Sequence, residues 1–153
     1  GTKSSMSLLE TIDKDLTSAL KAGDRHKATV LRGLKSDLKY KKIDKGAELT
    51  HEDIIAVLST AAKKRRESIE QFQRGNRMDL VEQEQRELDL ITAYLPRQLS
   101  EDDLRTLIAE AIRETGAQSA ADLGRVMKAL MPKVRGQADG KLVNQLAAKM
   151  LAK

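Results

Sequence analysis

Apolar residues recur at intervals of three and four along almost the whole chain, and this spacing restricts the possible folds more than any other feature. No run of β-branched or aromatic residues alternates with a period of two, as a half-buried strand would require. The pattern therefore predicts an all-α protein. Seven helices are expected, with apolar stripes at 9–20, 28–38, 54–72, 81–95, 104–112, 123–130 and 142–150.

Short polar motifs indicate where several of these helices begin. A Ser or Thr followed three residues later by Asp has the spacing of a capping box, in which each side chain satisfies a backbone N–H of the first turn. The motif occurs at Thr50, Ser100 and Ser119. Asp24 and Asp139 are expected to cap two further helices.

The turns between helices predict the domain organisation. Only Gly75 and Asn76 separate the third and fourth helices, so these two long helices are expected to form an antiparallel hairpin. Pro96 should end the fourth helix just before it, because the residue that precedes a proline is disfavoured in the helical region. The expected organisation is an N-terminal helical domain at 6–96 and a three-helix tail domain at 97–153.

Composition excludes several kinds of chemistry. The 153 residues carry a net charge of +5 and include no cysteine, which removes disulfides, thiolate metal sites and thiol nucleophiles. No apolar run approaches the roughly 18–20 residues that cross a bilayer, so a cytosolic protein without a membrane partner is expected. Gly1 to Ser5 is expected to be a cloning remnant ahead of Met6 and is left out of the fold prediction.

The sequence offers little for catalysis. His26 and His51 lie at expected helix starts and have no metal-ligand spacing, and no glycine-rich nucleotide loop or nucleophile motif is present. Asp53, Asp103 and Asp122 already have expected capping roles. We therefore expect no catalytic residue, no metal and no cofactor.

Two charged residues interrupt the apolar stripes of the hairpin, Arg65 in the third helix and Glu84 in the fourth. One interpretation is that the arginine extends its charged end to water from the edge of the stripe. The other is an inward polar pair that sets the register of the two helices. The first is favoured, because a buried ion pair must overcome a desolvation cost of several kcal/mol per ion.

Basic residues gather in three places. The cluster 39–45 ends the second helix, where cations are favoured by the helix dipole, so a structural role and a phosphate contact are about equally supported. The run 63–66 must spread around its helix and cannot form one flat patch. The third place is the segment 124–153, which holds seven basic residues and one acidic residue.

The segment 124–153 is the strongest candidate for binding a polyanion. Its basic residues are expected on polar helix faces and around a glycine-containing connection, where backbone can approach a ligand and the last helix offers free N–H groups. Glycine and proline are also what a simple helix–helix turn uses. The candidate nucleic-acid-binding residues are Arg125, Lys128, Lys133, Arg135, Gly136, Gly140 and Lys141.

Three stretches carry a family resemblance: KKRRESIEQFQRGNRMDLVEQEQREL at 63–88, AYLPRQLSEDDL at 93–104 and GRVMKALMPKVRGQADGKLVNQL at 124–146. They resemble the GatB/YqeY family, small helical proteins related to the tail of the tRNA-dependent amidotransferase B subunit. Length implies the free-standing YqeY type. The resemblance implies a helical domain followed by a three-helix tail, and it implies that the tail contacts tRNA through Lys128, Lys133, Arg135, Gly136, Gly140 and Lys141.

The function implied by this resemblance is a non-catalytic tRNA-binding accessory module of aminoacyl-tRNA metabolism. Its expected partners are tRNA and an aminoacyl-tRNA synthetase or amidotransferase. The family is also described as having carbon–nitrogen ligase activity with glutamine as amido-N-donor, but the catalytic domain for that chemistry is not recognised in these residues. The alternative is a protein–protein adaptor that docks its helical hairpin on a larger translation-related enzyme.

Overall fold

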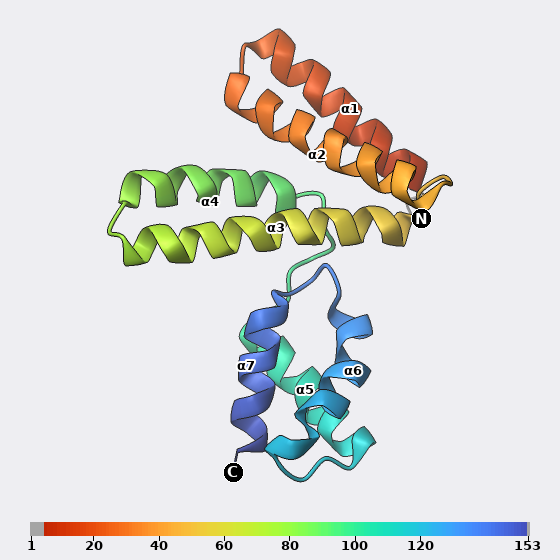
Figure 1. Ribbon diagram of the computed structural model, residues 1–153, viewed down its shortest axis with the longest axis vertical. Helices are drawn as coiled ribbons and strands as arrows, with labels where there is room; N and C mark the ends of the chain where they lie inside the picture. The colour runs from red at the N-terminus through yellow and green to blue at the C-terminus, as the bar shows by residue number, and fades with distance from the viewer. Residues whose placement is uncertain (1–4, 153) are drawn as a thin grey trace. The chain divides into compact units, whose positions relative to one another are not determined.

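The computed structural model describes residues 5–152, which contain helices and no strand (Figure 1). The predicted all-α fold is therefore confirmed. The helices are α1 (Ser5–Ala22), α2 (Arg25–Lys45), α3 (His51–Arg74), α4 (Met78–Thr92), α5 (Glu101–Thr115), α6 (Leu123–Val134) and α7 (Gly140–Leu151), with a short 3₁₀ helix, η1 (Ala120–Asp122), before α6. The expected cloning remnant lies outside the described residues, apart from Ser5.

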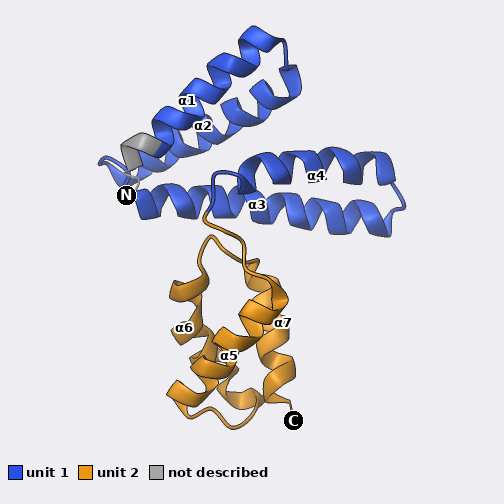
Figure 2. Cartoon of the chain, turned by 180° about the vertical axis from the view of Figure 1, so that it is seen from behind, with its two compact units in different colours: residues 1–95 blue, residues 96–153 orange. Residues whose placement is uncertain are grey.

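The chain divides into two compact units, residues 1–95 and 96–153, which we call unit 1 and the tail unit (Figure 2). Unit 1 consists of two helical hairpins, α1–α2 and α3–α4, and the expected hairpin of α3 and α4 is confirmed. The two hairpins share one core. Its largest fully buried side chains are Ile12, Leu31, Leu34, Ile54, Leu58 and Ile91.

The tail unit is a three-helix arrangement of α5, α6 and α7 around its own apolar core. The core residues repeat at helical spacing, so each helix buries one stripe and leaves its polar face in water. The side chains at the centre are fully buried. They are Leu104, Ile108, Val126, Leu130, Val134 and Val143.

Two helix ends differ from the sequence prediction. Helix α4 ends at Thr92 and not at Leu95, because the chain tightens into i→i+3 hydrogen bonds such as Leu95 N–H to Thr92 O before it reaches Pro96. Helix α6 includes Pro132 and continues to Val134. A proline costs a helix one backbone hydrogen bond, and here the last turn buries Val134 completely, which offsets that loss.

Two of the three predicted capping boxes are confirmed. Thr50 accepts a hydrogen bond from the Asp53 N–H at 3.1 Å and Asp53 accepts one from the Thr50 N–H at 2.9 Å; Ser100 and Asp103 form the same pair. The box at Ser119 is wrong. The Ser119 hydroxyl accepts a hydrogen bond from the Ala121 N–H, within η1. The Asp122 carboxylate accepts one from the Gln118 N–H, so the two residues do not form the reciprocal pair of a capping box.

Removing a confirmed cap is expected to cost stability. Ser100→Ala should lower the free energy of unfolding by about 1 kcal/mol, because one first-turn N–H of α5 loses its acceptor. Ser119→Ala is the matched control and should cost less, since the bond to Ala121 is longer, at 3.3 Å, and caps only η1. Urea unfolding of both variants measures the difference, and equal costs would contradict the assignment.

The box at Thr50 also predicts a dependence of stability on pH. The Lys45 ammonium that donates to Asp53, together with the Thr50 N–H, lowers the pKa of Asp53 from 3.8 to about 2. A carboxyl whose pKa is lowered by folding stabilises the fold when ionised, so this contribution is lost as pH falls from about 4 to about 2. Asp53→Asn should therefore flatten the acid-induced fall in melting temperature over that range.

The exposed Asp44 supplies the control for this measurement, because its side chain has no hydrogen-bond or ion-pair partner in the described part of the chain. Asp44→Asn should keep the acid dependence of the unsubstituted protein. An Asp53→Asn variant with that same dependence would contradict the predicted role of the Lys45–Asp53 contact.

Candidate nucleic-acid interface

Helix α6 separates its apolar and basic residues onto opposite sides. Val126, Leu130 and Val134 recur every four residues and are fully buried against α5 and α7. Arg125 and Lys128 are both exposed. Burial of the apolar stripe therefore determines which side of the helix presents positive charge to the solvent.

The five basic candidates of the tail unit are all exposed. Two lie on the polar side of α6, a third follows in its last turn, the fourth is the residue after the helix, and the fifth is the second residue of α7. They are Arg125, Lys128, Lys133, Arg135 and Lys141. The tail unit thus presents several cationic groups to solvent, as contact with a polyanion requires.

Two of these cations form ion pairs with acidic side chains. The Arg125 guanidinium lies 3.1 Å from a carboxylate oxygen of Asp122, and the Lys133 ammonium lies 3.2 Å from one of Glu114. The Gln118 N–H, with a smaller effect of Arg125, holds the pKa of Asp122 below its usual value, so this carboxylate stays charged. Exposed pairs of this kind are worth little and are screened by salt, so a phosphate can compete for both cations.

Lys128 and Arg135 differ from their neighbours in lacking an acidic partner. Both side chains are exposed, and neither makes an ion pair with any of residues 5–152. An arginine without a carboxylate keeps its planar fork of donors available for a phosphate. These two residues are therefore the best candidates for phosphate contacts in the tail unit.

Gly136 is not open to a ligand, contrary to the sequence prediction. It is buried, and its carbonyl oxygen accepts a hydrogen bond from the Gln98 amide at 2.8 Å. Its φ of 78° lies in the left-handed region, which favours glycine. Gly136 therefore turns the chain between α6 and α7, which is a role in the fold of the tail unit.

The start of α7 is also a weaker phosphate site than the sequence suggested. The Asp139 carboxylate accepts a hydrogen bond from the Lys141 N–H at 3.2 Å, which places a negative group where a phosphate would have to approach. Gly140 is half-buried, and a Cβ there would meet Met131 at an ordinary contact distance of 3.6 Å. The residues Asp139 and Gly140 thus have roles in starting α7. At this helix start, the Lys141 side chain remains the candidate for a phosphate contact.

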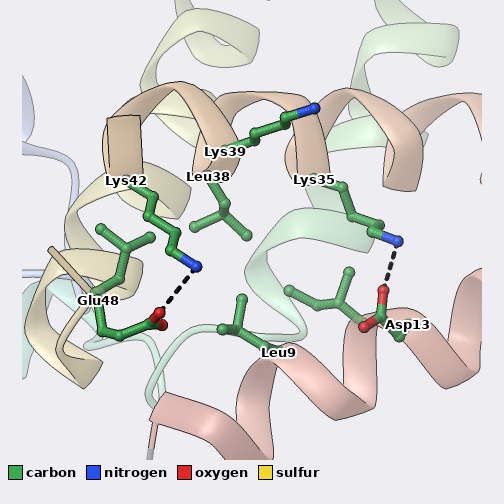
Figure 3. A pocket seen from close by; sticks show the side chains of 9 residues that line it. Leu9, Asp13, Lys35, Leu38, Lys39, Lys42 and Glu48 are labelled. Atoms are coloured by element: carbon green, nitrogen blue, oxygen red, sulfur yellow. Dashed lines mark ion pairs between the residues drawn. The ribbon is translucent and has the colours of Figure 1, made fainter. Parts of the chain in front are cut away.

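The basic cluster in α2 borders a hollow of about 210 Å³ in unit 1 (Figure 3). Two lysines that line the hollow form ion pairs: Lys35 Nζ lies 2.6 Å from Asp13, and Lys42 Nζ lies 2.9 Å from Glu48. Lys39 extends away from the apolar floor at Leu9. Ion pairs within unit 1 thus engage two of the three lysines that line the hollow, Lys35 and Lys42.

The charged residues on the hairpin stripes form an inward polar cluster, so the interpretation of Arg65 as a side chain that extends to water is wrong. Arg65 Nε donates to a carboxylate oxygen of Glu87 at 3.2 Å and lies 3.9 Å from one of Glu84. His26 Nε2 lies 3.9 Å from the other Glu87 oxygen. Burial, and then the charge of Glu87, raises the pKa of Glu84. The cluster joins α2, α3 and α4.

Sequence reasoning missed Glu87 and gave His26 no partner. Glu87 follows Glu84 by three residues, which places both carboxylates on one side of α4. This spacing could have indicated that both face Arg65. His51 is the first residue of α3, as expected, and it is half-buried. Among the residues that the structure describes, no group of His, Cys, Asp or Glu is placed to hold a metal ion.

The contact between Arg65 and Glu87 should contribute to stability. Glu87→Gln removes the charge that faces a mostly buried guanidinium, and we expect a loss of about 1–3 kcal/mol in the free energy of unfolding. Glu82→Gln, on an exposed position of the same helix, should change it by less than about 0.5 kcal/mol. Chemical denaturation distinguishes the two, and a cost at Glu87 no greater than at Glu82 would contradict the cluster's role.

Comparison with known proteins decides the family. The model of the Yqey-like protein family matches residues 9–151, which include both units. The chain belongs to the Yqey-like family. The predicted YqeY-like family is thereby confirmed, and the matched residues include both hairpins of unit 1 and all three helices of the tail unit.

Several curated relatives of this Yqey-like chain are fungal proteins. "Altered inheritance of mitochondria protein 41, mitochondrial" of Lachancea thermotolerans is 40% identical over 96 residues, which cover 60% of this chain and 51% of the relative. The protein of the same name from Clavispora lusitaniae is 29% identical over 124 residues, covering 79% and 72%. An uncharacterised protein of Schizosaccharomyces pombe is 30% identical over 93 residues, covering 61% and 76%. The chain spans about half the length of the Lachancea and Eremothecium gossypii relatives.

The expected cytosolic location is wrong by these comparisons, because the relatives from Lachancea, Eremothecium and Vanderwaltozyma are all named as mitochondrial proteins. The prediction rested on the lack of a long apolar run. In the described part of this Yqey-like chain no helix is long and apolar enough to span a bilayer. Proteins of many compartments share that property, so it could not identify one.

Proposed function

We propose that this Yqey-like chain is a non-catalytic tRNA-binding accessory module of aminoacyl-tRNA metabolism, and that its tail unit contacts the phosphates of the tRNA. The observation that carries the proposal is the exposure of all five basic side chains of the candidate surface, above all Lys128 and Arg135, which have no acidic partner in residues 5–152. Phosphate contacts of this kind supply affinity and position an RNA without reading its sequence.

Two further considerations support a tRNA over other polyanions. The stretch 124–146 resembles the tail of the tRNA-dependent amidotransferase B subunit, whose tail helps to hold tRNA. The relatives named as mitochondrial belong to an organelle that translates with its own tRNAs, so mitochondrial tRNA is a natural probe beside bulk tRNA. A synthetase or amidotransferase is the proposed protein partner, because the module itself has no proposed catalytic residue.

A gel shift with bulk and mitochondrial tRNA across a range of salt concentrations tests the proposal. Because phosphate contacts release counterions, the logarithm of the binding constant should fall linearly with the logarithm of the salt concentration. An adaptor that only docks on a protein has no reason to bind tRNA with such a dependence. Absence of salt-dependent tRNA binding would reject the proposal and favour the adaptor.

A further inference from the structure

A groove of about 300 Å³ runs between α2 and α3, and all of its lining residues belong to unit 1. Helix α3 supplies a floor of small and apolar side chains. The Thr60 hydroxyl on this floor donates a hydrogen bond to the Ala56 carbonyl oxygen. Helix α2 supplies most of the polar rim. The lining residues are Asp37, Tyr40, Lys41, Ala56, Val57, Thr60, Ala61 and Lys64.

Tyr40 is the unusual member of this groove. The chain contains only three aromatic residues, two Tyr and one Phe. Phe72 packs against the core of unit 1, and the Tyr94 hydroxyl donates to Asp15 in a partly buried contact. Tyr40 is 73% exposed. Tyr40 is thus the one aromatic ring of this sequence whose face is available to a partner.

Basic residues outnumber acidic ones on the helix that carries Tyr40. Helix α2 carries eight Lys or Arg residues and two Asp residues. Lys41 and Lys64 line the groove beside Tyr40, and neither has an ion-pair partner among the described residues. Asp37 is the single carboxylate in the lining, so the two lysines outweigh it. An anionic ligand with a flat, unsaturated group would complement both features.

We propose that this groove binds a single-stranded segment of RNA, with one base stacked on Tyr40 and the neighbouring phosphates against Lys41 and Lys64. Stacking on an aromatic ring between cationic groups is the common way in which proteins hold single strands without reading their sequence. An acidic helix of a protein partner would match the charge. Such a helix would also need apolar side chains to pack against, and Tyr40 is the one large exposed apolar side chain in the lining. The RNA is therefore favoured.

The proposal is tested on the full chain with a fluorescein-labelled 12-nucleotide oligoadenylate, whose binding is followed by fluorescence anisotropy. Tyr40→Ala should weaken binding about 5- to 150-fold, the effect of losing one stacked base. Tyr40→Phe keeps the ring and should bind nearly as well as the unsubstituted protein. With an abasic strand of the same length, which offers phosphates but no bases, Tyr40→Ala should make little difference.

The lysines are tested by the salt dependence of the same binding. Lys41→Ala and Lys64→Ala should each reduce the slope of log K against log salt by roughly 0.7, the value for one phosphate contact of a single strand. Lys39→Ala is the matched control, because Lys39 lies on the same helix but does not line the groove. Lys39→Ala should change the slope less than Lys41→Ala or Lys64→Ala does.

Unchanged binding of the oligoadenylate by Tyr40→Ala would overturn the proposal, as would an equal loss on the abasic strand. The groove and the tail surface are tested separately. The fold loss of 12-mer affinity caused by Tyr40→Ala should be the same whether or not the charges of Lys128 and Arg135 are reversed. Failure of the tail proposal would appear with tRNA and those tail variants, whereas failure of the groove would appear with the 12-mer and Tyr40.

Discussion

The double variant Lys128→Glu/Arg135→Glu is expected to bind tRNA roughly tenfold or more weakly at physiological salt. Both side chains are exposed and unpaired within residues 5–152, so reversal removes two phosphate contacts and adds two repulsive charges. The loss should be similar for every tRNA, because phosphate contacts carry little base information. Binding titrations with several purified tRNAs measure this directly.

The fold of the double variant should be preserved, since both positions lie away from the tail core and surface substitutions usually change stability by less than about 0.5 kcal/mol. A comparable reversal in unit 1, Lys14→Glu/Arg86→Glu, has the same change in net charge at two exposed positions. It serves as the control for a general effect of charge. Equal losses in the two variants would show that the tail surface has no special role.

The second large effect is expected in the tail core. Leu130→Ala should destabilise the tail unit by about 2–5 kcal/mol, because Leu130 is fully buried and its truncation leaves a cavity among α5, α6 and α7. In calorimetry, the transition that belongs to the tail unit should move to lower temperature. Above that transition, tRNA binding through the tail should be lost.

Leu58→Ala is the matched control, because it makes the same truncation at an equally buried position in unit 1. It should shift the other transition and leave tRNA binding through the tail largely intact. A single transition that both variants move together would show that the two units unfold as one. Loss of tRNA binding by Leu58→Ala alone would contradict the assignment to the tail.

The helices were predictable because their signals are local. Thr50 and Ser100 lie three residues before an Asp in the sequence, and the capping bonds follow from that spacing alone. Ser119 has the same spacing and fails, because Asp122 bonds one residue earlier, to the Gln118 N–H. The spacing is thus a good indicator of a helix start but does not determine which backbone group the side chain meets.

Features that depend on contacts between helices were less predictable. The pairing of Arg65 with Glu87 depends on the register of α3 against α4, which apolar spacing does not define to within one turn. The burial of Gly136 depends on Gln98, which lies far from it in sequence. The exposure of Arg125, Lys128 and Lys133 was predictable, since these residues alternate with the buried stripe of α6.

The salt dependence of tRNA binding tests the central proposal most directly. For the unsubstituted chain, log K should fall linearly with log salt, and Lys128→Glu/Arg135→Glu should reduce the slope by roughly 0.7–0.9 for each contact that is lost. Lys14→Glu/Arg86→Glu should leave the slope nearly unchanged. A tail variant with the affinity and slope of the unsubstituted protein would contradict the proposal that the tail unit holds tRNA through its phosphates.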